Sequence, residues 1–261
     1  MTLKYFIYDI ESVVNKKLLN KVLYAGENLS DDDAYKKQVE ELAKDGKTFV
    51  NAAFHKPVSL AAVGVASDFS IIKIKLLGGE QKTSAAIVRE FWDIYNHKNP
   101  ILVDFNGKGY DVRLLELWAF QLGIKIHERH FKQFGTRYRF AEGSHLDLHD
   151  FFTNHGAIRW QGGLNFFSKL LGKPGKIGTK GEDVQGLYES GQQFAIDDYC
   201  LADAMDTYFI FLRTRVMTGE LTLEKEQQLV TNARTLLEEM SQSQGYFKLY
   251  LANFGEWVPE E

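Results

Sequence analysis

Residues 3–11 read LKYFIYDIE, an aromatic and β-branched run that ends in two carboxylates. Apolar residues on both of its faces are typical of a strand that is buried on each side or central in a mixed sheet. We therefore expect residues 3–10 to form a central strand. Asp9 and Glu11 are two residues apart where this strand ends, so their side chains project to the same face.

An ordered series of elements follows this strand. Residues 58–67 and 70–77 are strand-like runs separated by a short turn around Asp68, which predicts an antiparallel hairpin. Further elements are predicted, in order, as a helix at 87–95, a strand at 101–105, a helix at 114–122, a strand at 145–148, and long helices at 201–216 and 229–240. Three meander strands followed by alternating strands and helices predict an α/β fold with one mixed sheet flanked by helices.

The size and composition of the chain are those of an ordinary globular protein. Its 261 residues include 44% hydrophobic and 25% charged residues and only 4 Pro, which disfavours disorder and excludes a large multidomain machine. We interpret 1–261 as a single domain with an insertion at about 15–55 and a C-terminal helical extension at about 218–261. Within the insertion, Ser30 precedes three aspartates and a helical apolar pattern, so we expect it to cap a helix that could act as a flap.

The remaining composition bears on compartment and partners. A single cysteine, Cys200, excludes an intramolecular disulfide and a cysteine-ligated zinc cluster and favours a reducing compartment. The sequence shows no signal-peptide pattern at its start and no uninterrupted apolar run of 18 residues. We therefore expect a cytoplasmic protein with no membrane partner. The net charge of −4 disfavours a non-specific nucleic-acid coat but is compatible with an acidic site neutralised by cations.

Two further groups of residues join the first pair of carboxylates. Residues 106–111, NGKGYD, follow a strand and precede a helix, which places Asp111 at a helix start, where an aspartate can also act as a cap. Tyr199 and Asp203 are four residues apart and share one face of a long helix. Each feature alone also has an ordinary explanation as a solvated strand end, a helix cap or surface acids. The oxygen ligands of Asp9 and Glu11 suit Mg²⁺ or Mn²⁺ rather than zinc.

Taken together and in this order, the three groups resemble the three motifs of the DEDD exonucleases, whose fold is ribonuclease-H-like. The chain is similar in particular to the stand-alone 3′–5′ exonucleases related to the proofreading domain of family-B DNA polymerases. Tyr199, four residues before Asp203, matches the tyrosine subclass, in which a tyrosine replaces a histidine. The resemblance extends to FHKPVSLAAVGV at 54–65, HLDL at 145–148 and LLGKPGK at 170–176, and is weakest over 16–51 and after 217.

The resemblance implies a metal-dependent 3′–5′ exonuclease that hydrolyses single-stranded nucleic acid, DNA in preference to RNA, to nucleoside 5′-monophosphates. It implies two Mg²⁺ or Mn²⁺ ions, with Asp9 bridging both, Glu11 and Asp203 binding the ion that activates water, and Asp111 supporting the second. Tyr199 would orient the attacking water, because its hydroxyl is too weak an acid to act as a base at pH 7. The expected partner is the 3′ end of single-stranded DNA or RNA, and no polymerase or repair partner is identified.

Basic and aromatic residues alternate between residues 125 and 140, where Glu128 is the only acid. Cations that follow phosphates and rings that stack on bases are typical of single-strand binding. The rings could instead belong to the core, with the charges as a solvated rim. The residues concerned are Lys125, Arg129, Lys132, Arg137 and Arg139, with Phe131, Phe134, Tyr138 and Phe140. Lys132 and Arg137 are our candidates for substrate binding.

Other candidates have competing explanations. A run of lysines without acids, Lys169, Lys173, Lys176 and Lys180, could contact phosphate or form a loop, and Lys176 is the candidate within it. Asn106 could contact the substrate or order the turn before Asp111. Asp147 could support a metal ligand or cap the next helix. Cys200 is interpreted as a small packed residue rather than a nucleophile, because neighbouring acids oppose thiolate formation.

Two other functions share parts of this pattern. A phosphatase with an aspartyl nucleophile uses D-x-D at the end of its first strand, but Glu11 departs from that motif. A non-catalytic nucleic-acid-binding module could keep the fold with a decayed site, but this chain retains all four acids and the tyrosine. Metal-dependent release of mononucleotides from a 3′ end would distinguish the three functions.

Overall fold

A mixed five-stranded sheet lies at the centre of the computed structural model, which describes residues 2–178 and 181–259. The strands are β1 (Tyr5–Val14), β2 (His55–Val65), β3 (Ile71–Leu76), β4 (Ile101–Asp104) and β5 (His145–Asp147), and their order across the sheet is β3-β2-β1-β4-β5. β1, β2 and β3 pair antiparallel, whereas β1, β4 and β5 pair parallel. The predicted hairpin and mixed sheet are therefore confirmed, and the arrangement is consistent with a ribonuclease-H-like α/β fold.

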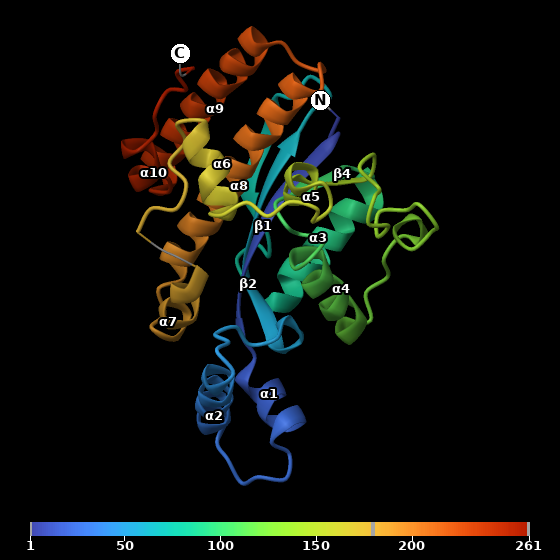
Figure 1. The fold of residues 1–261 in the computed structure, drawn as a ribbon, viewed down its shortest axis with the longest axis vertical. Coiled ribbons are helices and arrows are strands. Elements are labelled where there is room, and N and C mark those ends of the chain that lie inside the picture. The colour runs from blue at the N-terminus through green and yellow to red at the C-terminus, as the bar shows by residue number, and fades with distance from the viewer. Residues whose placement is uncertain (1, 179–180, 260–261) are drawn as a thin grey trace.

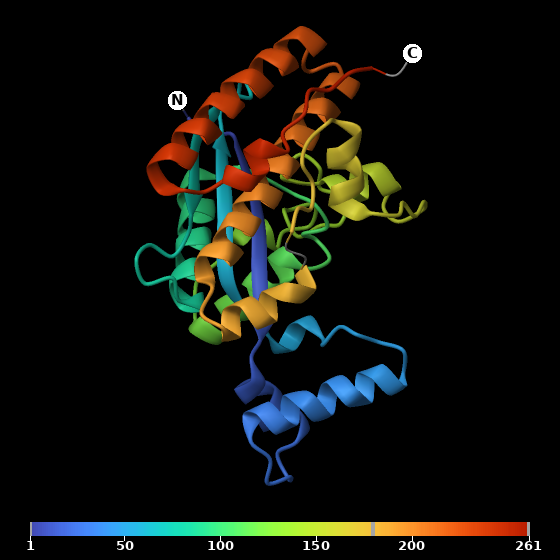
Figure 2. The same cartoon turned by 90° about the vertical axis from the view of Figure 1, so that its left-hand side faces the viewer.

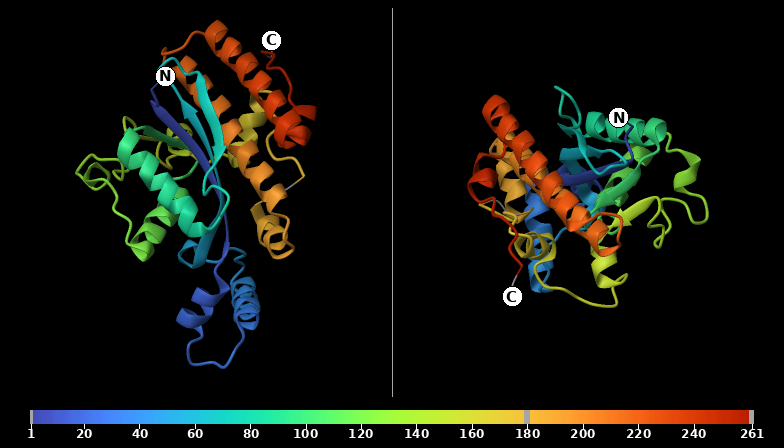
Figure 3. Two further views of the ribbon diagram at one scale, coloured as in Figure 1. Left: turned by 180° about the vertical axis from the view of Figure 1, so that it is seen from behind. Right: turned by 90° about the horizontal axis from the view of Figure 1, so that it is seen from above.

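Helices cover both faces of this sheet (Figure 1, Figure 3). On one face lie α3 (Ser84–Lys98) and α4 (Asp111–Leu122), and on the other lies α8 (Gln193–Met217), which α9 (Leu223–Gln244) covers in turn. The other helices of the described chain are α1 (Lys16–Leu23), α2 (Asp31–Lys44), α5 (Leu148–Thr153), α6 (Gly163–Leu170), α7 (Val184–Glu189) and α10 (Lys248–Ala252), with 3-10 turns η1 (Ala52–Phe54), η2 (Glu128–His130) and η3 (Gly181–Asp183). None of the described helices is long and apolar enough to cross a lipid bilayer.

The central strand is apolar on both faces because it contributes alternate residues to two cores. Phe6 and Tyr8 pack with α3 and α4, whereas Tyr5 and Ile7 pack with α8. Since side chains alternate along a strand, the odd-numbered row continues from Ile7 into the two carboxylates at positions 9 and 11. The acids of β1 therefore lie in the same row as the residues that pack against α8.

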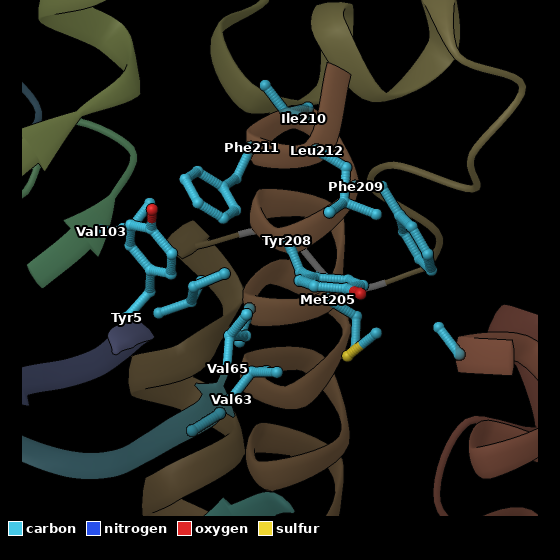
Figure 4. Close-up of a cluster of buried hydrophobic side chains, with 14 of the residues drawn as sticks. Tyr5, Val63, Val65, Val103, Met205, Tyr208, Phe209, Ile210, Phe211 and Leu212 are labelled. Carbon is cyan, nitrogen blue, oxygen red and sulfur yellow. The ribbon is translucent and has the colours of Figure 1, made fainter. Parts of the chain in front are cut away.

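Aromatic packing joins α8 to the sheet. The Phe211 ring lies 4.9 Å from the Tyr5 ring and 5.9 Å from the Phe69 ring, measured between centroids. Figure 4 shows Phe211 directed from α8 toward Tyr5. Most of α8 is buried, because it has the sheet on one side and α9 on the other. Apolar side chains all around a helix are typical of such a central position.

β1 is longer than predicted, because it continues through Val14. Asp9 and Glu11 therefore lie within the strand and not at its end. A register shift between Glu11 and Ser12 interrupts the pairing with β2, and such a bulge bends a strand without ending it. The polar residues at this bulge are what made the strand look shorter in the sequence.

The segment between β1 and β2 folds as a helical pair on a small core of its own. Ser30 caps α2 as predicted, by accepting a hydrogen bond from the Asp33 backbone N–H. α1 was not expected from the sequence, and it packs against α2 around Leu19 and Tyr24. The pair projects from one end of the sheet (Figure 1, Figure 2).

Phe211→Ala is expected to lower the free energy of unfolding by about 3 to 5 kcal/mol, because it removes a fully buried ring and leaves a cavity. Urea unfolding followed by circular dichroism measures this change. Phe120→Ala is the matched control, because the Phe120 ring is 87% exposed, and its effect should stay within about 0.5 kcal/mol. Equal losses in the two variants would contradict the packing assigned to α8.

Candidate active site

Three carboxylates from two elements converge at the centre of the molecule. One oxygen each from Asp9, Glu11 and Asp203 lies within 4.8 Å of the others. β1 supplies the first two from one row, and α8 supplies the third where it crosses that row. Cys200, one turn earlier on α8, links the two elements: its Sγ donates to the Asp9 carbonyl oxygen and accepts from the Ala61 backbone N–H, both at 3.3 Å.

The contacts of Cys200 agree with its interpretation as a packed residue. The side chain is fully buried. Burial raises the pKa of its thiol well above the usual value, and the charges of Asp9 and Glu11 raise it further. A thiol in this environment stays protonated, so it serves to hold α8 against the sheet.

Asp111 lies close to this cluster but is not one of the three converging residues. It is the first residue of α4, and Tyr110 occupies the N-cap position, so Asp111 is not the cap of this helix. The Asp111 charge nevertheless acts on Glu11, and the Asp9 charge acts on Asp111. Asp111 therefore approaches the cluster from the layer of α3 and α4, on the side opposite to α8.

Burial dominates the electrostatics of the four carboxyl groups. It raises the pKa of Asp9 to about 7 and raises the pKa values of Glu11, Asp111 and Asp203 well above their usual range, and repulsion from Asp9 adds to each of those three. Among the described residues, Asp9 Oδ2 is buried with no hydrogen-bond partner. Clustered hard oxygen donors with an unpartnered buried oxygen fit a divalent cation such as Mg²⁺ or Mn²⁺.

Two further predicted residues lie beside the cluster. Tyr199 is buried one turn before Asp203, and burial together with the charges of Asp203 and Glu11 raises its pKa well above the usual value of a tyrosine. Lys176 follows α6, and its positive charge partly offsets the rise in the pKa values of Asp9, Glu11 and Asp203. The surroundings of the cluster therefore include the protonated Tyr199 hydroxyl and the positive charge of Lys176.

Asp104 is a buried residue near the site that the sequence pattern did not indicate. The Tyr8 hydroxyl donates to Asp104 Oδ2 at 2.6 Å, and His145 Nε2 lies 2.6 Å from the same oxygen. The Gly107 N–H donates to Oδ1 at 3.1 Å, and a Cβ at Gly107 would come within 2.0 Å of Oδ2. Asp104 thus holds the turn before Asp111, and only glycine fits against it. The available signal was an acid and a histidine on two predicted strands.

Asp147 holds the same turn from the other side. It accepts hydrogen bonds from the backbone N–H groups of Asn106 at 2.8 Å and Lys108 at 3.0 Å, and it also caps α5. Asn106 has a φ of 71°, a left-handed conformation that asparagine tolerates better than most residues. The turn and cap interpretations therefore account for the backbone of both residues, while the Asn106 side chain is exposed.

The cations predicted between residues 125 and 140 lie on the surface. Lys132 pairs with Glu128 at 2.7 Å, and Arg137 pairs with Glu116 at 3.3 Å. The aromatic residues of this segment are exposed, so their interpretation as core residues is wrong; they are Phe131, Phe134, Tyr138 and Phe140. Burial could not be inferred from the sequence here, because residues 125–140 form no strand or α-helix whose periodicity would mark a buried face.

The lysines after α6 do not form one phosphate-binding run. Lys173 is buried, and its Nζ lies 4.2 Å from the centroid of the Phe254 ring and donates to the Gly255 carbonyl oxygen at 3.1 Å. Burial lowers its pKa to about 8. Lys173 therefore attaches the C-terminal segment to the core, whereas Lys176 lies toward the carboxylates. Lys180 lies outside the described residues.

Comparison with known proteins adds an independent observation. A search of curated proteins finds no match. Residues 47–254 match a family described as predicted 3′–5′ exonucleases related to the exonuclease domain of PolB. The match includes Asp111, Tyr199 and Asp203, whereas Asp9 and Glu11 precede it and join them through the structure. Because this match covers most of the chain, the protein belongs to the family of predicted 3′–5′ exonucleases related to the exonuclease domain of PolB.

Proposed function

We propose that this protein is a two-metal 3′–5′ exonuclease of the tyrosine class that releases nucleoside 5′-monophosphates from single-stranded nucleic acid, DNA in preference to RNA. The observation that carries the proposal is the convergence of Asp9, Glu11 and Asp203, with one Asp9 oxygen buried and unpartnered within the described chain. Membership of an exonuclease family supports the same reaction. Strongly repelling, desolvated carboxylates stay ionised as a group only with cations, which is the arrangement that phosphodiester hydrolysis uses.

The four carboxylates have distinct roles in this proposal. Asp9 would be shared by both ions, because its row on β1 faces α8 while its charge acts on Asp111 in the other layer. Glu11 and Asp203 would hold the ion next to the attacking water, and Asp111 would support the second ion. When bound, the two ions supply activation of water and stabilisation of charge on the leaving 3′ oxygen.

Other side chains would position the substrate and the water. The raised pKa of Tyr199 keeps its hydroxyl protonated at neutral pH, so it can orient water by hydrogen bonding but cannot act as a base. Lys176 would contact a phosphate near the carboxylates. Asn106, exposed in the turn before Asp111, is proposed as a further substrate contact. Lys132 and Arg137 would act farther from the reacting phosphate.

The function is tested with the full chain, a single-stranded DNA oligonucleotide and Mg²⁺ or Mn²⁺. A 5′ label should give a descending ladder, and a 3′ label should be released at once as a mononucleotide. Excess chelator should abolish both, and RNA of the same sequence should be degraded more slowly. Binding without metal-dependent cleavage would instead indicate a binding module, and release of phosphate from a phosphomonoester alone would indicate a phosphatase.

Substitutions of Asp203 and Tyr199 are expected to have different effects on metal binding and turnover. Asp203→Asn should reduce turnover to background and weaken metal binding, because it removes a charge that balances two dications. Tyr199→Phe should preserve folding and metal binding but lower kcat by about 10- to 1,000-fold, because it deletes one positioned hydroxyl. Metal titration and single-turnover cleavage of both variants measure this. Wild-type turnover in either variant would show that the motif is assigned to the wrong residues.

Stability should depend on pH and metal together. Folded Asp9 has a pKa of about 7 against an ordinary value of 3.8, so its contribution to stability is complete below about pH 4 and is lost as the pH rises through 7. In chelator, the melting temperature should therefore fall between pH 5 and pH 8. Mg²⁺ should raise it more at pH 8, because metal ligands must be ionised.

The matched control for this pH dependence is Asp9→Asn, in which the side chain cannot titrate. Its melting temperature should fall less between pH 5 and pH 8 in chelator, and it should respond less to Mg²⁺ at pH 8. Thermal unfolding at both pH values, with and without Mg²⁺, measures these differences. An equal Mg²⁺ response at both pH values in the wild type would count against the carboxylates as metal ligands.

A further inference from the structure

The segment between α4 and β5 carries a row of exposed aromatic rings that have no role in the proposed catalytic mechanism. Ring centroids of Phe134 and Tyr138 are 5.1 Å apart, those of Tyr138 and Phe140 are 5.6 Å apart, and that of His155 lies 4.5 Å beyond Phe140. The rings of Phe134, Tyr138 and Phe140 are 67%, 38% and 53% exposed. We call these three residues the aromatic row. Contiguous exposed rings of this kind are typical of a binding surface.

The backbone beneath the aromatic row is anchored to the protein. His130 is buried, and its Nε2 lies 2.7 Å from Glu116 Oε1 on α4. The Tyr95 hydroxyl donates to Thr136 Oγ1, which is also buried, at 2.7 Å. The rings therefore point outward from a fixed base.

Phe134 is held in a strained conformation at the exposed end of the row. Its φ is 62°, in the left-handed region that bulky residues rarely adopt. The next residue, Gly135, has no room for a side chain, because a Cβ there would come within 2.0 Å of the Arg129 carbonyl oxygen. An exposed ring gains little from packing, so strain at this residue is consistent with a role in binding.

The other end of the row adjoins the candidate active site. Lys108 Nζ donates to the Arg139 carbonyl oxygen at 2.8 Å, between Tyr138 and Phe140 in the chain. Lys108 belongs to the turn that Asp104 and Asp147 hold, three residues before Asp111. The segment lies beside β4 and extends away from the sheet (Figure 1). A strand that leaves the carboxylates on the α4 side would therefore meet the row.

The charge of the segment suits a polyanion. It has five basic residues and one acid between residues 125 and 140, in a chain of net charge −4. Arg129 and Arg139 donate to the carbonyl oxygens of Tyr95 and His155, so these contacts hold the guanidinium groups without cancelling their charge. The Arg139 guanidinium lies 5.9 Å from the centroid of the Phe140 ring. Exposed rings alternating with cations are the combination that binds unpaired nucleotides.

We propose that the aromatic row and Arg139 bind the unpaired nucleotides upstream of the 3′ end, with bases stacked on the rings and a phosphate at Arg139. The proposal rests on the proposed function, which brings a single strand to the carboxylates, and it adds a second contact region that selects unpaired over paired strands. Bases in a duplex are stacked on each other and cannot reach these rings.

The test uses Phe134→Asn in the full chain, because asparagine tolerates the left-handed backbone that phenylalanine strains. The variant should melt at or above the wild-type temperature and bind a 12-nucleotide DNA strand about 5- to 100-fold more weakly, the loss of one stacked base. Fluorescence anisotropy measures binding in an Asp203→Asn background, where no strand is cleaved. Affinity for a blunt duplex of the same sequence should not change. If Phe134→Asn fails to fold, Tyr138→Leu carries the same test.

A charge variant and a surface control separate stacking from charge. Arg139→Gln keeps a donor for the His155 carbonyl oxygen but removes the charge, so the slope of log K against log salt should become shallower by about 0.7. Phe134→Asn should leave that slope unchanged. Tyr188→Ala, an exposed ring on α7 away from the row, should bind as the parent protein does.

The outcomes separate this proposal from the proposed function. If the wild type cleaves in a metal-dependent way and a folded Phe134→Asn variant binds the strand with unchanged affinity, strand binding by the aromatic row is overturned. The proposed exonuclease function is then unaffected. Weaker strand binding in the variant, with no cleavage by the wild type, would support the row and overturn the exonuclease. Equal losses on single strand and duplex would also overturn the row, because they would show that the ring does not stack on unpaired bases.

Discussion

The contact between α8 and β1 is the constraint on which the rest of the structure depends. It brings Asp203 within 4.8 Å of the two β1 carboxylates, although burial and mutual repulsion make that approach unfavourable without cations. The energy that enforces it comes from apolar packing on the same two elements, in which Phe211 lies 4.9 Å from Tyr5. Cys200 lies one turn away from Asp203 and donates to the Asp9 carbonyl oxygen. This contact fixes the position of α8 along β1. Apolar packing between α8 and β1 thus offsets the unfavourable burial and repulsion of the carboxylates beside it.

The site lies where the two layers of the protein meet. α8 contributes Asp203 from one face of the sheet, and α4 contributes Asp111 from the other. Asp104 and Asp147 supply the connection, because they satisfy the backbone N–H groups of the turn that enters α4. Since a buried N–H without a partner is costly, these two acids determine where the turn can lie. Asp104 and Asp147, to which no catalytic role is assigned, therefore determine the position of Asp111, to which one is.

Two basic segments near the surface are each attached to one of the layers that form the site. Lys108 belongs to the supported turn and also binds the backbone of the aromatic segment, so the position of that segment is coupled to the start of α4. On the other side of the cluster, the backbone N–H of Lys176 donates to the side-chain oxygen of Asn165 on α6. A substrate at the carboxylates would thus lie between two cationic segments that are each attached to a different layer.

The sequence by itself determined the elements with strong local signals. Alternation and helical spacing predicted the hairpin of β2 and β3, the helices α3, α4 and α8, and the Ser30 cap, because these signals depend on neighbours within a few residues. The order of the acids and Tyr199 along the chain indicated a candidate site through its resemblance to the motifs of a known family. Only the tertiary structure decided the continuation of β1 past Glu11, the burial of Lys173, the exposure of the 125–140 rings and the bond of Asp104 to His145. Each of these depends on what another part of the chain places beside the residue, and a local pattern carries no information about that.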